Sequence, residues 1–235
     1  MENLKHPNPI TRFKAYVGLF WQENRQFFLL LFCIVFFKSA IADLSSISGA
    51  SMQPTLLDGD KVWVNKLAYD IKVPFTEIAL ASVADPKRGD IVIFDSKMAH
   101  KRLVKRIVGV PGDTIYMQNN ALVINGKAAN YEVVSRDDNA LIILEDLPGK
   151  SHRARLSRNF VSRSNRSYGP TEVPEGQYFV LGDNRDNSSD SRIYSFVPRE
   201  EIMGRSSSVV FSLDSNNKYL PRGNRFMANL DKQTQ

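Results

Sequence analysis

The sequence predicts a mostly β protein whose antiparallel sheets follow one apolar helix. Three observations support this fold class. Helical periodicity is weak from residue 45 onward, short runs rich in β-branched and aromatic residues recur there, and Gly, Pro, Asn and Asp turns separate these runs. The predicted strands cover residues 61–64, 90–94, 102–108, 114–117, 121–124, 177–181 and 207–211. The predicted turns include residues 58–60, 87–90, 111–113 and 125–126.

The composition is that of a basic globular chain. A length of 235 residues allows one domain with a sizeable core, and 43% hydrophobic and 24% charged residues exclude a disordered or collagen-like chain. The net charge of +6 suits nucleic acid or an anionic membrane surface and does not choose between them. Cys33 is the only cysteine, which excludes an intramolecular disulfide. His6, His100 and His152 are scattered, so no metal site is expected, and His100 and His152 are expected at the surface.

The first element is an apolar stretch over residues 27–42. Its uninterrupted part, 27–37, is shorter than the roughly 20 residues that cross a bilayer, and Lys38 extends it by snorkelling. A helix that is apolar on all sides needs a large core or lipid, so we expect a single transmembrane anchor here. Basic residues exceed acidic ones in residues 1–26, which keeps that segment cytoplasmic and exports residues 43–235.

A second interpretation of the N-terminus stays open. Ala40, Ile41 and Ala42 form a small-x-small pattern after a basic region and an apolar region. This pattern is typical of a cleavage site, so residues 1–42 could be a removed signal peptide.

Another distinctive segment, residues 150–171, carries many basic residues. We expect a solvated loop or part of an inserted subdomain. Contact with anionic lipid headgroups is the second alternative. Nucleic-acid binding is the third, because few aromatic residues are present to stack on bases. The basic residues are Lys150, Arg153, Arg155, Arg158, Arg163 and Arg166.

Two segments have the residues for chemistry. In the predicted strand 102–108, Leu103, Lys105 and Ile107 share one face because side chains alternate. Burial between aliphatic side chains lowers the pKa of the Lys105 ammonium by about 2–3 from its ordinary value of about 10.4, which makes it a candidate general base. In segment 48–56, small residues precede Ser51 and Pro54 stiffens the chain after it, so another peptide backbone could approach closely.

The order of these motifs is specific. Ser51-Met52-x-Pro54-Thr55 precedes Lys105-Arg106, and an eleven-residue block, GDNRDNSSDSR, follows at residues 182–192. In these motifs the chain resembles bacterial type I signal peptidases, which are membrane-bound serine–lysine proteases. The resemblance covers the anchor and nearly all of the strand-rich region. It implies a catalytic core over about 43–114 and 175–213, with a smaller inserted β subdomain over about 115–174.

The resemblance also implies roles for individual residues. Ser51 is then the nucleophile and Lys105 the general base. Ser188 orients the lysine amine, Asp190 and Arg192 brace the block, and Gly182 and Asp183 begin it, where a small residue leaves room for the lysine. The oxyanion hole includes the backbone N–H of Ser51. Some relatives have a serine at the position of Gly49, so a hole built from backbone groups alone, at Ser51 and Gly49, is expected here. Substrate pockets for small side chains would be lined by Ile47, Met52, Leu56, Leu103 and Val104.

The expected function follows from these roles. The protein would remove signal peptides from exported preproteins after small-x-small motifs, on the outer (periplasmic) side of a bacterial inner membrane. The substrate would lie extended as an added strand. Its partners would be preprotein signal peptides and membrane lipid, without nucleic acid, metal or cofactor. Two alternatives remain: a dedicated serine–lysine peptidase for one exported substrate, and a membrane-tethered basic binding module.

Overall fold

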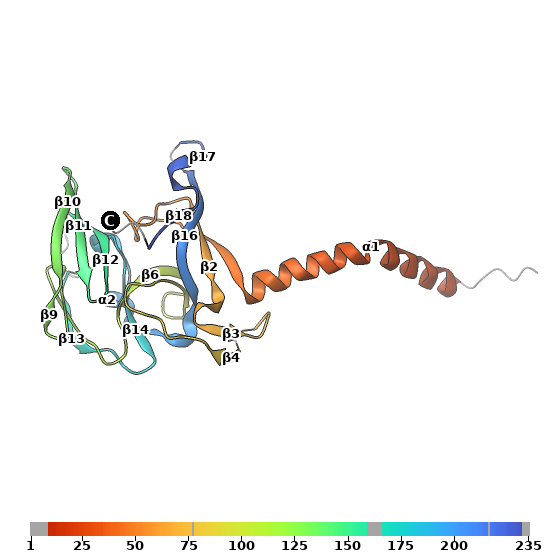
Figure 1. Cartoon of the computed structure of the whole chain (residues 1–235), viewed down its shortest axis with the longest axis horizontal. Coiled ribbons are helices and arrows are strands. Elements are labelled where there is room, and N and C mark those ends of the chain that lie inside the picture. The colour runs from red at the N-terminus through yellow and green to blue at the C-terminus, as the bar shows by residue number, and fades with distance from the viewer. Residues whose placement is uncertain (1–8, 77, 159–165, 216, 232–235) are drawn as a thin grey trace, which may run out of the picture.

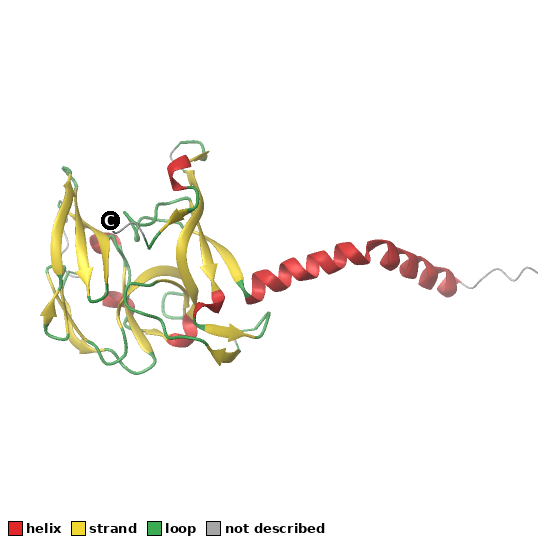
Figure 2. Cartoon of the chain, viewed as in Figure 1, coloured by secondary structure: helices red, strands yellow, loops and turns green. Residues whose placement is uncertain are grey.

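A computed structural model describes residues 9–76, 78–158, 166–215 and 217–231. One long helix, α1 (Pro9–Ala40), projects away from a body of strands (Figures 1 and 2). The other helices are single short turns between strands. They are η1 (Lys66–Ala68), η2 (Arg185–Asn187), α2 (Ser191–Tyr194), η3 (Arg199–Glu201) and η4 (Gly223–Arg225).

The largest sheet is antiparallel and runs in the order β1-β2-β16-β5-β6-β14-β15, with β17 and β18 paired to β16. Its strands are β1 (Ala42–Ser46), β2 (Asp60–Asn65), β5 (Ile91–Ser96), β6 (Lys101–Gly109), β14 (Gln177–Leu181), β15 (Val197–Pro198), β16 (Ile202–Asp214), β17 (Leu220–Pro221) and β18 (Ala228–Asn229). The sheet is therefore built from both ends of the strand-rich region, with the middle of the chain elsewhere.

That middle part forms two smaller antiparallel sheets. One has the order β13-β7-β8-β9, and the other is the three-stranded sheet β10-β11-β12, which lies at the far side of the body from α1 (Figure 1). A separate hairpin pairs β3 (Asp70–Lys72) with β4 (Ala79–Ser82). The strands of the two smaller sheets are β7 (Thr114–Gln118), β8 (Ala121–Ile124), β9 (Lys127–Ala128), β10 (Asn130–Arg136), β11 (Ala140–Leu147), β12 (Lys150–Ser157) and β13 (Tyr168–Glu172).

Local sequence explains the β7–β8 hairpin. Ile115 and Met117 are buried on one face of β7, whereas Thr114 and Gln118 at its ends are exposed. The two-residue turn between the strands is Asn119-Asn120, and both residues have positive φ, 52° and 68°. Such a turn matches the twist of the flanking strands, and asparagine tolerates positive φ better than most residues.

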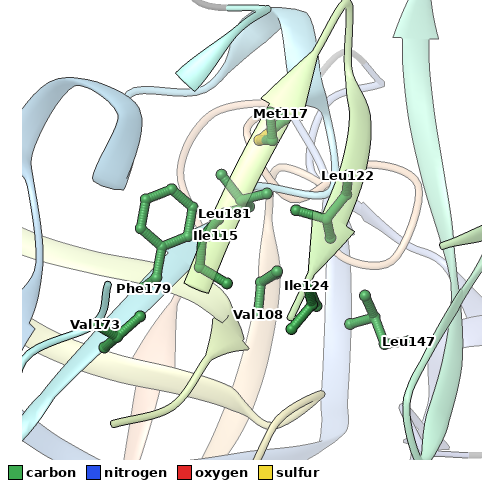
Figure 3. Close-up of a cluster of buried hydrophobic side chains, with 9 residues drawn as sticks. All are labelled: Val108, Ile115, Met117, Leu122, Ile124, Leu147, Val173, Phe179 and Leu181. Atoms are coloured by element: carbon green, nitrogen blue, oxygen red, sulfur yellow. The ribbon is translucent and has the colours of Figure 1, made fainter. Parts of the chain in front are cut away.

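Apolar side chains from different sheets meet in shared clusters. In Figure 3, Phe179 and Leu181 of β14 pack with side chains of β7 and β8, and Leu147 of β11 joins them. Two further clusters lie under the largest sheet, one around Val92, Ile107 and Val180 and the other around Met52, Leu56, Val62 and Val209. The cluster in Figure 3 comprises Val108, Ile115, Met117, Leu122, Ile124, Leu147, Val173, Phe179 and Leu181.

All seven predicted strands are present, and two of them, residues 121–124 and 177–181, have the predicted bounds. The helix is longer than the apolar stretch, because it starts at Pro9 and includes the polar residues 22–26. No helix in the described ranges is both long enough and apolar enough to cross a membrane, so the transmembrane anchor expected over 27–42 is not confirmed.

The basic segment is not a solvated run. Residues 150–157 form β12, and Arg155 and Arg166 bind Gln53 and Asp186 respectively. A solvated loop is therefore wrong for this part, whereas the other half of the expectation, a part of an inserted subdomain, stays a prediction. Arg163 lies outside the described residues. The surface position expected for His152 is also wrong, because it lies on the inner face of β12 with 1% of its surface exposed. Its carboxylate neighbours come from β11 and from residue 183, which sequence proximity does not reveal. His100 is exposed, as predicted.

Candidate active site

The structure brings Ser51 and Lys105 together although they are 54 residues apart. Ser51 is half-buried in the turns that follow β1, and Lys105 lies on β6. Lys105 Nζ is 2.8 Å from Ser51 Oγ and also donates a hydrogen bond of 3.0 Å to the carbonyl oxygen of Val104. A serine hydroxyl at this distance from an amine is suitably placed for proton transfer.

Burial sets the protonation of the lysine. Lys105 is 2% exposed, and this burial lowers its pKa to about 8 because water no longer solvates the charged form. Nearby Asp190 and Asp183 raise the pKa, while Lys101 and Arg192 lower it. The amine is therefore neutral in mildly alkaline solution, the form that can accept a proton.

The strand β6 is covered on both faces. Leu103 and Ile107 pack in the same apolar cluster, as the alternation predicted. Arg106 points to the other face and is also buried, at 2% exposure. It donates two hydrogen bonds to Asp183, of 2.8 and 2.7 Å, and one of 2.9 Å to the carbonyl oxygen of Gly89. The sequence did not reveal this ion pair, because its partners are 77 residues apart.

Close packing explains the glycine at the start of block 182–192. A Cβ on Gly182 would lie 2.5 Å from the carbonyl oxygen of Ser51 and 2.2 Å from Ser188 Oγ. Only a residue without a side chain fits there. Ser188 Oγ is buried and has no hydrogen-bond partner among the described residues, so the hydrogen bond expected from Ser188 to Lys105 is not made in this structure.

The rest of the block is held by charged hydrogen bonds. Asp190 accepts from Gly182 N at 2.9 Å and from the Arg192 guanidinium at 2.8 Å, so these bonds join the two ends of the block. Asp183 also accepts from Thr55 Oγ1 at 2.5 Å. The Arg106 guanidinium and the Thr55 hydroxyl hold the pKa of Asp183 below its ordinary value despite its burial.

Asn184 contacts the backbone beside Ser51 directly. Its N–H donates to the carbonyl oxygen of Ser51 at 3.0 Å, and its amide Nδ2 donates to that of Ala50 at 3.0 Å. Sequence reasoning gave Asn184 no role. The one available signal for such a role was the position of Asn184 inside block 182–192, which carries the family resemblance.

The N–H of Gly49 is not free to bind an oxyanion. It donates to Asp58 Oδ1 at 2.9 Å, and Asp58 Oδ2 accepts from Ser215 Oγ at 2.6 Å. These two bonds hold the pKa of Asp58 below its ordinary value. Gly49 has a φ of +90°, a conformation that favours glycine. The N–H of Gly49 is therefore already bound to Asp58, and the prediction that it contributes to an oxyanion hole is wrong.

The five predicted pocket residues fall into two groups. Ile47, Met52 and Leu56 are buried in one cluster with the half-buried Val104 against it, whereas Leu103 packs in the cluster on the other side of β6. Met52 and Leu56, at 2% and 0% exposure, act mainly as core. Leu103 and Val104 lie where β6 has only β5 as a neighbour among the described strands, since β14 pairs with it from Arg106 to Gly109.

A serine hydroxyl at a buried amine, on a scaffold of antiparallel sheets, is an arrangement typical of hydrolases that attack carbonyl carbons. Comparison with known proteins identifies which ones. Residues 21–211 match the family described as signal peptidase, peptidase S26. The chain belongs to this family of peptidases.

Several curated relatives are similar over most of their length. Signal peptidase I of Pseudomonas fluorescens is 33% identical over 81% of this chain and 72% of its own. Signal peptidase I of Aquifex aeolicus is 34% identical, over 80% and 82%. Among solved structures, the crystal structure of a signal peptidase I from Enterococcus faecalis V583 is 29% identical, with a TM-score of 0.36 over 53% of this chain and 98% of that one.

Proposed function

We propose that this protein is a serine endopeptidase that removes N-terminal signal peptides from exported preproteins, with Ser51 as nucleophile and Lys105 as general base. The observation that carries the proposal is the 2.8 Å approach of a buried Lys105 amine to the Ser51 hydroxyl. Because the pKa of Lys105 is about 8, a neutral amine is available as the base and no histidine is needed.

The chemistry proceeds in two halves. Neutral Lys105 accepts the hydroxyl proton as Ser51 Oγ forms a bond to the scissile carbonyl carbon, and the backbone N–H of Ser51 stabilises the oxyanion. The C–N bond then breaks, and Lys105 gives its proton to the departing amine. A water molecule next loses a proton to Lys105 and attacks the acyl-enzyme. The ester C–O bond breaks, and Ser51 recovers its proton.

The open edge of β6 supports the proposed substrate geometry. Among the described strands, β5 pairs with β6 from Lys101 to Arg106, whereas β14 pairs with it only from Arg106 to Gly109. We propose that an extended peptide adds to β6 on the side of β14 and ends beside Lys105. Leu103 and Val104 are apolar, half-buried and lie along this part of β6. We propose that they line the pockets for the peptide and that cleavage follows small-x-small motifs.

We further propose that α1 attaches the protein to the bacterial cytoplasmic membrane, with residues 43–235 on the outer side. Its large apolar side chains from Phe27 to Phe37 are widely exposed, for example Leu29 at 63% and Leu30 at 60%. Exposed apolar surface of this extent marks a contact with lipid or protein. Alkaline carbonate extraction of cell membranes tests this: protein retained in the pellet supports attachment, and release into the supernatant contradicts it.

The decisive experiment measures cleavage of a reporter preprotein by the purified, detergent-solubilised protein, with Ser51→Ala and Lys105→Ala in parallel. Cleavage after the small-x-small motif by wild type alone supports the proposal. If wild type cuts only one native exported substrate, a dedicated peptidase is the better description. If neither variant loses activity, the assigned site is wrong.

A further inference from the structure

A buried charge cluster lies beside the candidate active site and has no role in the steps above. Glu145 of β11 is 0% exposed, and Arg185, the first residue of η2, is 1% exposed. Arg185 Nη1 donates to Glu145 Oε1 at 2.7 Å, and Arg185 Nη2 donates to Glu145 Oε2. This ion pair is one of several contacts between the three-stranded sheet and block 182–192, and it is the one made by two buried, oppositely charged side chains. The backbone of β12 also contacts the block, since Arg155 N donates to the carbonyl oxygen of Asp183 at 2.7 Å and Ser157 N donates to Asp186 Oδ2 at 2.8 Å.

A chain of short contacts connects this pair to the nucleophile. The carbonyl oxygen of Arg185 accepts from Arg192 Nη2 at 2.7 Å. Arg192 Nε donates to Asp190 Oδ1 at 2.8 Å, and Asp190 Oδ2 accepts from Gly182 N at 2.9 Å. Gly182 in turn packs against the carbonyl oxygen of Ser51 so closely that a Cβ would not fit. Every member of this chain up to Gly182 is a charge-assisted hydrogen bond.

We infer that Glu145 is a positioning residue for peptide cleavage, which acts through Arg185 to hold block 182–192 against Ser51 and Lys105. The inference rests on the proposed function. Glu145 touches neither reacting group, so its effect passes through the block. Loosening the block would admit water to Lys105 and displace the Ser51 backbone, and small displacements of reacting groups slow chemistry steeply.

The charged and titratable groups around Lys105 and Glu145 determine what a pH profile of cleavage measures. Lys105 is surrounded by Asp183, Asp190 and Arg192 of the block and by Lys101 of its own strand. Glu145 faces Arg185, His152 of β12 and Tyr131 of β10. Burial and Arg106 lower the pKa of His152 to about 3, and the pKa of Tyr131 is raised by burial. Among the groups in this set whose pKa is shifted, Lys105, with a pKa of about 8, is the one that the cleavage rate reports between pH 6 and 10.

The test compares kcat, KM and the pH midpoint of cleavage for wild type, Glu145→Gln and Arg185→Lys. Glu145→Gln keeps the shape of the side chain and removes its charge. Arg185→Lys keeps the positive charge and removes the forked guanidinium, so the two parallel hydrogen bonds to Glu145 can no longer form. Each is expected to lower kcat about ten- to a hundredfold, change KM little, and move the pH midpoint upward as Lys105 becomes better hydrated. Since both break the same link, the double variant should lose little more than either alone.

Controls separate the possible failures. Glu132→Gln alters an exposed glutamate on β10 of the same sheet and should leave all three parameters unchanged. Wild type and Ser51→Ala run in the same assay, so an inactive wild type contradicts the proposed function itself. Folded Glu145→Gln with wild-type kcat and pH midpoint overturns the inference alone, whatever its melting temperature. If Glu145→Gln does not fold, Arg185→Lys decides by the same criteria.

Discussion

The protonation of Lys105 is the central property at the scale of single residues. A buried ammonium is costly, and the fall in pKa from 10.5 to about 8 corresponds to about 3 kcal/mol. Because the folded state binds this proton less tightly than the unfolded chain, stability increases as pH rises from 8 to 10.5. Below pH 8 the charge is present in both states, and the full cost applies.

Replacing the lysine should therefore stabilise the fold. Lys105→Met is expected to raise the free energy of unfolding at pH 7 by up to about 3 kcal/mol, and the gain should shrink as pH approaches 10.5. Urea unfolding at pH 7 and pH 10 measures both values. An equal gain at the two pH values would contradict a depressed pKa.

The rate of cleavage should show the same titration. We expect kcat/KM to rise through an apparent pKa of about 8 as Lys105 becomes neutral, and to fall below that pH. A pH profile over the range 6–10 checks this. A limb near 6.5 that disappears in His100→Ala would contradict the assignment, because it would make a histidine the base.

Gly182 allows a steric test. Gly182→Ala places a methyl group against the Ser51 carbonyl oxygen, which is backbone and cannot rotate away. We expect a loss of about 1–3 kcal/mol in stability and about a hundredfold in kcat, measured by thermal unfolding and peptide cleavage. Gly223→Ala, where a Cβ meets nothing within 4 Å, is the matched control and should change neither.

At the scale of elements, β6 joins the core to the site. It contributes Ile107 to an apolar cluster, Lys105 to the Ser51 hydroxyl and Arg106 to Asp183. Alternation along one strand therefore serves packing and chemistry together. The Arg106–Asp183 ion pair links β6 to block 182–192, which follows β14.

Removing one partner of this pair should be costly. Arg106→Met leaves the Asp183 carboxylate buried without a cation, for an expected loss of about 3–5 kcal/mol. Arg106 and Thr55 hold the pKa of Asp183 below its ordinary value in the folded protein despite burial. The ion pair therefore stabilises the fold fully at pH values above the pKa that Asp183 has in the unfolded chain. This stabilisation is lost as the pH falls through the lower pKa of the folded state. The acid-unfolding midpoint should thus move to higher pH in the variant. An unchanged midpoint would contradict this role.

Sequence reasoning was most successful where one segment carries its own signal. Residues 121–124 and 177–181 are apolar runs bounded by turn residues, and both form strands within the predicted bounds. It failed for β12, because the inward His152 and Ala154 alternate with charged residues that dominated the interpretation. Asp58 was missed as well, since its bond to Gly49 depends on how the chain folds back, which local sequence does not encode.

At the scale of the whole molecule, α1 and the body are nearly independent. The helix contributes no residue to the three apolar clusters of the described chain. Its last turn is hydrogen-bonded to the body, since Lys66 Nζ donates to the carbonyl oxygens of Lys38 and Ser39, and Cys33, Ile34 and Phe37 share a pocket with Leu44 and Trp63. The body should therefore fold without most of the helix.

Truncation tests this independence. Removal of residues 1–32 should leave the melting temperature and the cleavage of a soluble peptide unchanged, because the contacts of residues 33–39 with the body remain. Cleavage of preprotein in lipid vesicles should fall about tenfold or more, since the enzyme is no longer concentrated at the surface. Equal rates on vesicles would contradict membrane attachment, and a lower melting temperature would contradict the independence of the body.

The incomplete pairing of β6 has a consequence for the protein in concentrated solution. An edge to which a substrate strand can add is also open to a strand of another copy, which is a route to aggregation. Here that part of the edge is short, and it begins with the exposed Lys101. A charged lysine at an edge opposes pairing with an identical edge, so the same short stretch that suits a substrate strand resists a second copy of the chain.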